Sequence, residues 1–384
     1  MSVDQDVQPF ELPARYRDLQ QEARELAKVV APIADRADES ATVDAEVRAL
    51  LTESELARVV VPARFGGRDE AVDSLAVTVV REALAYECAH LDSLFAMQGI
   101  GSFGLSTCGN VELQQEWLPK VASMEAIAAL ALTEPQVGSD LKAMTTSVKP
   151  EGDMLVVNGH KSFITNGGAA GFYSVLAKEG DGYSLVLVPA DAEGVRVETP
   201  FQIIAPHILG DIVFDNVRVP EGNRISAPGE GFGLVLNTLA TFRVSVAGAA
   251  VGLAQAALDE AVRHTSSREQ FGVSLARLGP IPSFLAQSWV DVEMSRTFAY
   301  RAAAAAARDP KANLHLSSIA KAGATEAAGR VVDRSVQMMG RFGLVRGSKI
   351  ERLYREARPM RIYEGSTEVI FDSLAKKLVR DGVK

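Results

Sequence analysis

The sequence predicts a mainly α-helical protein with a central β domain. Apolar residues recur with helical spacing before about residue 124, short β-type runs separated by turn residues fill the middle, and long alanine- and leucine-rich patterns follow residue 228. We therefore expect an N-terminal helical domain over residues 1–124, a β domain over residues 125–227 and a C-terminal helical bundle over residues 228–384.

Composition narrows the class of protein. The chain has 384 residues, enough for two or three domains, and a net charge of −9 without a basic run argues against nucleic acid as a partner. Cys88 and Cys108 form no Cys-x-x-Cys motif, so we expect neither a disulfide scaffold nor a metal site. The N-terminus is acidic and polar, and no apolar run approaches about 18 residues. We expect a cytoplasmic protein that does not enter a membrane.

The N-terminal third has the period of amphipathic helices. Leu19, Ala23, Leu26 and Val30 share one helical face, and Pro32 marks an end. Two more helices are expected over residues 77–86 and 113–121.

The middle of the chain contains short β-type runs at residues 145–148, 154–157, 162–165, 173–176, 184–188 and 212–214. Turn residues lie between them, including Asn158-Gly159, an expected hairpin turn, and Asn166-Gly167-Gly168. Regular short strands with tight turns predict an antiparallel barrel or sandwich.

After Pro228 the pattern is helical to the end, with long helices expected over residues 246–263, 283–308 and 314–339 and Gly340 as a stop. The sequence has no Gly-x-Gly-x-x-Gly motif after a strand, which argues against a Rossmann nucleotide site.

Glu364 is the candidate catalytic residue. It lies between apolar neighbours and Gly365, and Ser366 is placed to cap a following helix with Glu368 in its first turn. A carboxylate on such a turn can be desolvated and made more basic, as a general base requires. The alternative is a solvated glutamate in an inter-helix loop.

Three other segments are candidates for ligand contacts. Leu132-Thr133-Glu134-Pro135 leads into Gly138-Ser139-Asp140, a loop whose N–H groups and hydroxyls can hold a phosphate or a polar ring edge, or simply form a turn. Phe163-Ile164-Thr165 ends a strand, where the aromatic ring can equally be a core residue. Arg268 follows a helix and can grip a phosphate or form a surface ion pair.

Together, in this order, these segments resemble the acyl-CoA dehydrogenase family over nearly the whole chain. The matching motifs are Leu132-Thr133-Glu134-Pro135 with Gly138-Ser139-Asp140, Ile164-Thr165-Asn166-Gly167, Phe214-Asp215-Asn216-Val217-Arg218-Val219-Pro220, Gly229-Glu230-Gly231-Phe232, Arg268 with Phe271-Gly272, and Ile362-Tyr363-Glu364-Gly365. The resemblance implies that the C-terminal helices form a four-helix bundle.

The resemblance also implies FAD as the cofactor and assigns residues to it. Leu132 and Thr133 would meet the flavin ring, with Phe163 and Thr165 on its other edge, and the Gly138-Ser139 loop would approach the pyrophosphate. Four positions resemble those that reach the FAD of a neighbouring subunit: Arg268, Phe271, Gln337 and Gly340. Two more follow the base at cofactor-contacting positions: Ser366 and Glu368. The substrate-binding positions implied are Ser139, Arg243 and Gly365.

In the mechanism implied by this resemblance, Glu364 takes the α-proton of an acyl thioester while flavin N5 takes the β-hydride, giving a trans-2-enoyl thioester. The implied partners are an electron-transfer flavoprotein and further copies of the chain, most often a homotetramer, with a dimer as the alternative. The thioester carrier is coenzyme A or, as in relatives that serve polyketide pathways, an acyl carrier protein. The rival functions are a flavin oxidase or monooxygenase, against which the Glu364 carboxylate argues, and a non-enzymatic scaffold.

The sequence departs from the family pattern at three places that leave the base and the flavin strands intact. Arg341 stands where a second glycine is usual, Gly279 and Pro280 replace glutamines, and His207, expected in a turn, lies in an altered segment. In addition, Asp92 falls where glutaryl-specific relatives place an arginine. A carboxylate facing a substrate carboxylate would repel it, so we expect an acyl group that is uncharged at its far end. The alternative is that Asp92 only caps a helix or faces solvent, which also leaves the pocket without a cation.

Overall fold

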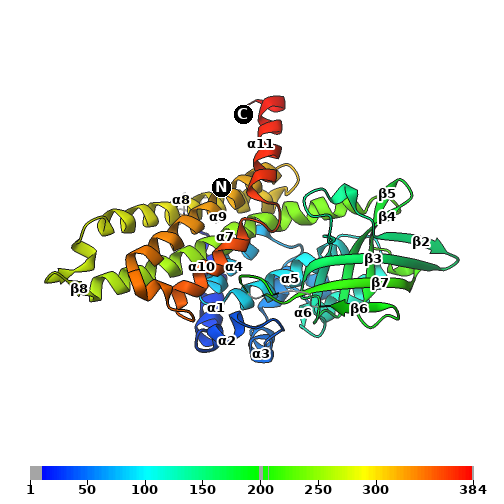
Figure 1. Ribbon diagram of the computed structural model, residues 1–384. Helices are drawn as coiled ribbons and strands as arrows, with labels where there is room; N and C mark the ends of the chain where they lie inside the picture. The colour runs from blue at the N-terminus through cyan, green and yellow to red at the C-terminus, as the bar shows by residue number, and fades with distance from the viewer. Residues whose placement is uncertain (1–10, 199–201, 206, 383–384) are drawn as a thin grey trace, which may run out of the picture.

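The computed structural model describes residues 11–198, 202–205 and 207–382. N-terminal helices lie at the centre of the molecule, a β sheet forms one end and long C-terminal helices form the other, while the last helix, α11, projects away from the body (Figure 1). The predicted order of a helical region, a β region and a helical region is confirmed.

The described residues of the N-terminal region form six α-helices joined by short 3-10 turns: α1 (Ala14–Val30), α2 (Ala34–Asp38), α3 (Ala45–Glu53), α4 (Ser74–Ala85), α5 (Ala89–Ser106) and α6 (Val111–Ala122). The side chains of Asp44 and Asp73 accept hydrogen bonds from the first backbone N–H groups of α3 and α4 and thereby fix where these helices begin. Every residue of α4 is buried, so this helix forms the centre of the core.

The middle region is a seven-stranded sheet in the order β1-β4-β2-β3-β7-β6, with β5 paired to β4. Its strands are β1 (Ala128–Ala131), β2 (Ser147–Glu151), β3 (Met154–Thr165), β4 (Phe172–Glu179), β5 (Gly182–Pro189), β6 (Val195–Glu198) and β7 (Leu209–Pro220). Most pairs are antiparallel, as expected, but β1 and β2 both pair in parallel with β4. The β1–β4 pairing is non-local, so the run of short strands did not reveal it.

The expected hairpin turn at Asn158-Gly159 is wrong. Both residues lie inside β3, where the register against β7 shifts between Val157 and Gly159. A Cβ on Gly159 would stand 2.3 Å from Oγ1 of Thr146, so the glycine allows close contact between chains at a bulge.

The C-terminal region consists of α7 (Gly231–Ser267), a small hairpin of β8 (Glu269–Gln270) and β9 (Val273–Ser274), α8 (Ile281–Arg308), α9 (Leu314–Met339), α10 (Lys349–Met360) and α11 (Thr367–Asp381). Helix α7 packs directly on the backbone of α4, since a Cβ on Gly248 or Gly252 would stand about 2 Å from the carbonyl oxygens of Thr78 and Glu82. This contact fixes the side chains of α4 and α7 relative to each other.

Helix α7 qualifies the expectation that no segment is apolar enough to cross a membrane. By length and composition it is the one helix of the described residues that passes that test, but 72% of its most apolar window is buried inside the fold. The core position of α7 against α4 explains its apolar composition.

Candidate functional site

Glu364 lies on the turn between α10 and α11, as predicted. Its backbone is left-handed, with a φ of 52°, and Gly365 follows with a φ of 101°. Ser366 caps α11 through a hydrogen bond from the N–H of Val369, and Glu368 lies in the first turn of that helix. The alternative of a solvated loop glutamate is wrong, because Oε2 of Glu364 is inaccessible and has no hydrogen-bond partner among the described residues.

Two cations from neighbouring helices hold this turn. Nε of Arg243, on α7, donates to the carbonyl oxygen of Glu364 at 3.0 Å, and Nζ of Lys321, on α9, donates to that of Gly365 at 2.7 Å. Burial lowers the pKa of Lys321 to about 8, against the opposing effect of the Glu364 charge. Burial raises the pKa of Glu364 above its ordinary value, and the positive charges around it limit the rise.

The structure corrects the interpretation of Asp92. This carboxylate neither caps a helix nor faces solvent or substrate unpaired: it is 4% exposed and accepts two hydrogen bonds from Arg81, at 2.8 and 2.7 Å. A buried cation is therefore present beside the base, and the expected repulsion of a substrate carboxylate by a free Asp92 does not hold. The signal that sequence reasoning missed is Arg81 itself, a charged residue inside the apolar pattern of α4.

The predicted flavin strands are tied together by a second buried ion pair, which sequence reasoning also missed. Lys161, fully buried on β3, donates to Glu134 at 3.1 Å and to the carbonyl oxygen of Leu132 at 2.9 Å. Burial raises the pKa of Glu134, but hydrogen bonds from the 145–146 segment and the charge of Lys161 bring it down to about 2. The N–H of Ser162 donates to the carbonyl oxygen of Thr133 at 2.8 Å, which holds the 132–133 segment against β3.

Phe163 and Thr165 lie at the end of β3, beyond a shift of register between Lys161 and Ile164. Phe163 adopts a φ of 56° and is 50% exposed, although an aromatic strand residue would ordinarily pack inward. The bulge thus turns an aromatic ring outward next to the partly exposed Thr165 and Thr133. The alternative of a core aromatic at this position is wrong.

The hairpin of β8 and β9 lies at the end of the helical region opposite the sheet (Figure 1). Arg268 and Phe271 flank β8, and Gln337 and Gly340 lie at the end of α9, close to the Phe342 ring that Arg268 contacts. The Arg268 guanidinium lies 4.9 Å from the ring of Phe342, next to Gly340, and Phe271 at the hairpin tip is 94% exposed. These residues and those around Phe163 therefore do not meet one flavin within a single chain. That separation fits the expectation that they reach the cofactor of a neighbouring subunit.

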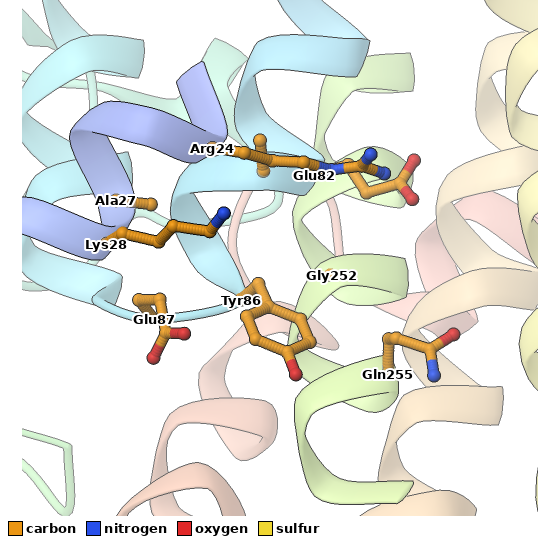
Figure 2. A pocket seen from close by; sticks show the side chains of 9 residues that line it. Arg24, Ala27, Lys28, Glu82, Tyr86, Glu87, Gly252 and Gln255 are labelled. Atoms are coloured by element: carbon orange, nitrogen blue, oxygen red, sulfur yellow. The ribbon is translucent and has the colours of Figure 1, made fainter. Parts of the chain in front are cut away.

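A cleft of about 300 Å³ lies between α1, α4 and α7, and none of the predicted site residues lines it. Figure 2 shows its polar side chains, among them Arg24, Lys28, Glu82 and Tyr86. Arg81, Arg243, Lys321 and Glu364 are not among its lining residues, so the cleft is separate from the site around Glu364.

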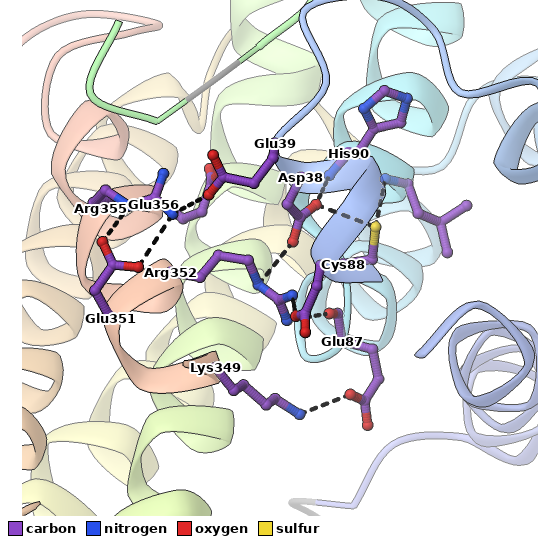
Figure 3. Close-up of polar contacts among 12 residues, drawn as sticks. Asp38, Glu39, Glu87, Cys88, His90, Lys349, Glu351, Arg352, Arg355 and Glu356 are labelled. Carbon is purple, nitrogen blue, oxygen red and sulfur yellow. Dashed lines mark hydrogen bonds and ion pairs between the residues drawn. The ribbon is translucent and has the colours of Figure 1, made fainter. Parts of the chain in front are cut away.

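A cluster of ionisable side chains joins α10 to the N-terminal helices and so anchors the segment that leads to Glu364 (Figure 3). Arg352 on α10 approaches Asp38 at the end of α2, with 3.1 Å between Nε and Oδ2, and Arg355 pairs with Glu39. Glu356 is buried beside them, with its Oε2 3.5 Å from Nε2 of His207. Burial lowers the pKa of His207 to about 4, so the neutral imidazole is a packed loop residue.

The residues present fit a flavin. A flat ring with polar edges matches the outward Phe163 ring and the hydroxyls of Thr133 and Thr165. A Cβ on Gly138 would meet no atom within 4 Å, so packing within the chain does not require glycine at this position. A phosphate that approached the loop closely would require it, because a side chain would stand in the way. Among the residues that the structure describes, no group of histidine, cysteine and carboxylate side chains is arranged to hold a metal ion.

Comparison with known proteins shows the family to which the chain belongs. Three family models match in sequence: the acyl-CoA dehydrogenase N-terminal domain over residues 13–125, the middle domain over residues 129–217 and the C-terminal domain over residues 229–379.

Curated relatives match over most of their length. The chain is 34% identical over 381 residues to the probable acyl-CoA dehydrogenase FadE25 of Mycobacterium tuberculosis, covering 97% of each chain. It is 36% identical over 349 residues to the cyclohex-1-ene-1-carbonyl-CoA dehydrogenase of Geobacter metallireducens, covering 88% of this chain and 91% of the relative.

Among solved structures, butyryl-CoA dehydrogenase from Megasphaera elsdenii superposes with a TM-score of 0.91 at 27% identity, covering 97% of this chain and 100% of that one. The protein is an oxidoreductase that acts on acyl-CoA, and its chain belongs to the acyl-CoA dehydrogenase family.

Proposed function

We propose that this protein is an FAD-dependent dehydrogenase that converts an acyl-CoA thioester to the trans-2-enoyl thioester, with Glu364 as the general base. The observation that carries the proposal is the Glu364 carboxylate, whose Oε2 is buried without a partner on a turn held by Arg243 and Lys321. A desolvated, unbonded carboxylate is free to accept a proton from a carbon acid. The bound flavin would supply the acceptor for the hydride.

The chain's own residues hold and orient the reactants in this proposal. Leu132, Thr133, Phe163 and Thr165 would hold the flavin ring, and the Gly138-Ser139 loop would approach its phosphates. Arg243 fixes the backbone of the base rather than presenting a free charge to substrate, because it bonds the carbonyl oxygen of Glu364 and the hydroxyl of Ser318. Its contribution to substrate binding would therefore be to keep Glu364 in register with the α-carbon.

The test is anaerobic reduction of the purified flavoprotein by acyl-CoA thioesters, comparing wild type with Glu364→Gln and with Glu356→Gln. Both substitutions keep the shape of a buried side chain on the same segment, but only the first removes the proposed base. Loss of flavin bleaching in Glu364→Gln alone supports the proposal. Equal bleaching in wild type and Glu364→Gln contradicts it.

We also propose an acyl group that is uncharged at its far end, now for a different reason. Each cation beside Glu364 already has a partner: Arg81 is bound to Asp92, while Arg243 and Lys321 hold backbone carbonyls. A substrate carboxylate would have to displace Asp92 from Arg81 or compete with a contact that holds the Glu364 turn. Butyryl-CoA should therefore reduce the flavin faster than glutaryl-CoA, and the reverse order would refute this part of the proposal.

The third part of the proposal concerns partners. The chain assembles into a homotetramer in which neighbouring subunits complete each flavin site, and an electron-transfer flavoprotein reoxidises the reduced flavin. Exposed apolar side chains on α8 and the hairpin tip support assembly, since they lie unburied in the single chain. They are Trp289, Val290, Met294 and Phe271. The Arg268→Ala variant should lose both FAD and the native oligomer, because a ligand that binds across subunits stabilises the assembled state. Normal FAD content and oligomer size, measured by absorbance and light scattering, would disprove the role of Arg268.

A further inference from the structure

Arg81 on α4 and Asp92 on α5 form an ion pair inside the protein. Nε and Nη2 of Arg81 donate to the two oxygens of Asp92 at 2.8 and 2.7 Å, and Nη1 donates to Oγ of Ser245, on α7, at 3.0 Å. The two charged residues are only 3% and 4% exposed. Desolvating both charges is costly, and well-packed apolar side chains at the same places would often be no less stable. The pair therefore calls for an explanation other than stability.

The pair lies close to the turn of the base, because Arg81 donates to Ser245 on α7, two residues from Arg243, which donates to the carbonyl oxygen of Glu364. The side-chain charges that act on the pKa of Glu364 come from four helices: Arg81 on α4, Asp92 on α5, Arg243 on α7 and Lys321 on α9. Burial raises the pKa of Tyr363, on the same turn, while the charge of Arg81 lowers it and that of Asp92 raises it. Of the side-chain charges, that of Arg81 lowers the pKa of Glu364 the most, and that of Asp92 raises it. The two members of the pair thus act on the base in opposite directions.

Arg81 differs from the other two cations in how it is held. Arg243 and Lys321 are bonded to backbone carbonyls of the Glu364 turn, so removing either would move the turn itself. The hydrogen bonds of Arg81 go to Asp92 and Ser245, outside the turn. Its charge reaches Glu364 through a poorly hydrated interior, where screening is weak.

We propose that the Arg81–Asp92 pair is a positioning unit that sets the protonation of Glu364: Arg81 favours the ionised base in its desolvated site, and Asp92 both fixes the guanidinium and limits its effect. Too little positive charge would leave Glu364 protonated, and too much would make it a weak base. This inference rests on the proposed role of Glu364 and assigns to two further residues the tuning of that role.

The test is a pair of charge-removing variants, Arg81→Met and Asp92→Asn. In Arg81→Met, the cation is lost and Asp92 is left unpaired, so the titration midpoint of Glu364 should move to higher pH. In Asp92→Asn, the cation is left unopposed, so the midpoint should move to lower pH. The readout is the infrared band of the protonated Glu364 carboxyl, followed across pH as the difference from a matching Glu364→Gln protein, which requires no substrate.

Opposite shifts support the inference, since a purely structural role predicts no shift or shifts of the same sign. A double variant, Arg81→Met with Asp92→Leu, buries no unpaired charge and guards against failure of the single variants to fold. Its midpoint should lie above that of wild type, because the effect of Arg81 on Glu364 exceeds that of Asp92. An unchanged or lowered midpoint in the double variant overturns the inference.

Arg224→Met serves as the matched control, because Arg224 forms a partly buried pair with Glu179 in the β region, at 2.6 Å. It should leave the Glu364 midpoint where it is. The pH profile of flavin reduction by butyryl-CoA should shift in the same directions as the infrared midpoints. If none of the thioesters tested reduces the flavin of the wild-type protein, the proposed function fails. The infrared titration uses no substrate and still decides the inference about Arg81 and Asp92.

Discussion

Glu356 and Glu364 are near neighbours in the sequence, and burial raises the pKa of both, yet their surroundings differ. The charges of Asp38 and Glu39 raise the pKa of Glu356 further, and those of Arg355 and Arg352, on its own helix, oppose this rise without cancelling it. Around Glu364 the positive charges outnumber the single carboxylate of Asp92. These surroundings favour the protonated form of Glu356 and the release of a proton from Glu364.

The difference teaches that burial alone does not make a catalytic base. Burial without enough positive charge produces a neutral acid, which is a structural group. Within the cluster of Figure 3, Asp38 receives the N–H of His90 and faces Arg352, contacts that favour its ionised form, whereas burial favours the protonated form of Glu356. The same residue type serves as a base only where cations from other helices converge on it.

Among the changes that test the difference between Glu356 and Glu364, the largest expected effect is on the chemical step. Glu364→Gln should slow flavin reduction by about 10²–10⁴-fold, the contribution of a positioned general base. Glu356→Gln should reduce flavin at close to the wild-type rate, because glutamine resembles the protonated acid. Stopped-flow absorbance under anaerobic conditions measures both, and a similar loss in the two variants would end the distinction between them.

The next effect is on stability. Arg352→Met removes the cation that faces the buried Asp38 and should cost about 3–5 kcal/mol, as breaking one partner of a buried pair does. Arg330→Met, which removes a half-exposed partner of Asp291, should cost about 0–1 kcal/mol. Denaturant unfolding followed by circular dichroism compares the two. Equal losses would show that the cluster of Figure 3 does not anchor α10.

The pH dependence of catalysis should follow the raised pKa of Glu364. The base must be ionised to accept the α-proton, so flavin reduction should slow as the pH falls through that pKa. The residual rate of Glu364→Gln should lack this step. A wild-type rate that stays level on acidification would place proton removal on another group.

The smallest effect concerns the stability of the Glu356 variant. A carboxyl whose pKa is raised on folding contributes stability that is fully present below its unfolded pKa and is lost as the pH rises toward the folded value. Glu356→Gln should abolish that loss. The difference between the thermal midpoints of the variant and the wild type should therefore shift in favour of the variant as the pH rises from acidic to mildly alkaline. Parallel midpoints for the two proteins would mean that Glu356 is ionised in the fold.

The sequence by itself determined the order of the regions, most long helices and the turn that carries Glu364, because these depend on local spacing, caps and glycines. Ser366 capping α11 and Gly340 ending α9 are such local features. Asn158-Gly159 misled for the same reason: the dipeptide is a turn signal locally, and only pairing with β7 makes it a bulge.

Tertiary structure alone decided which charges meet. Arg81, Asp92, Arg243 and Lys321 come from four helices, and their effect on Glu364 depends on how those helices pack, which no spacing in the sequence encodes. The partner of Asp92 was missed for this reason. Electrostatic interactions in a poorly hydrated interior are strong and act across elements, so the protonation of the base is a property of the assembled fold.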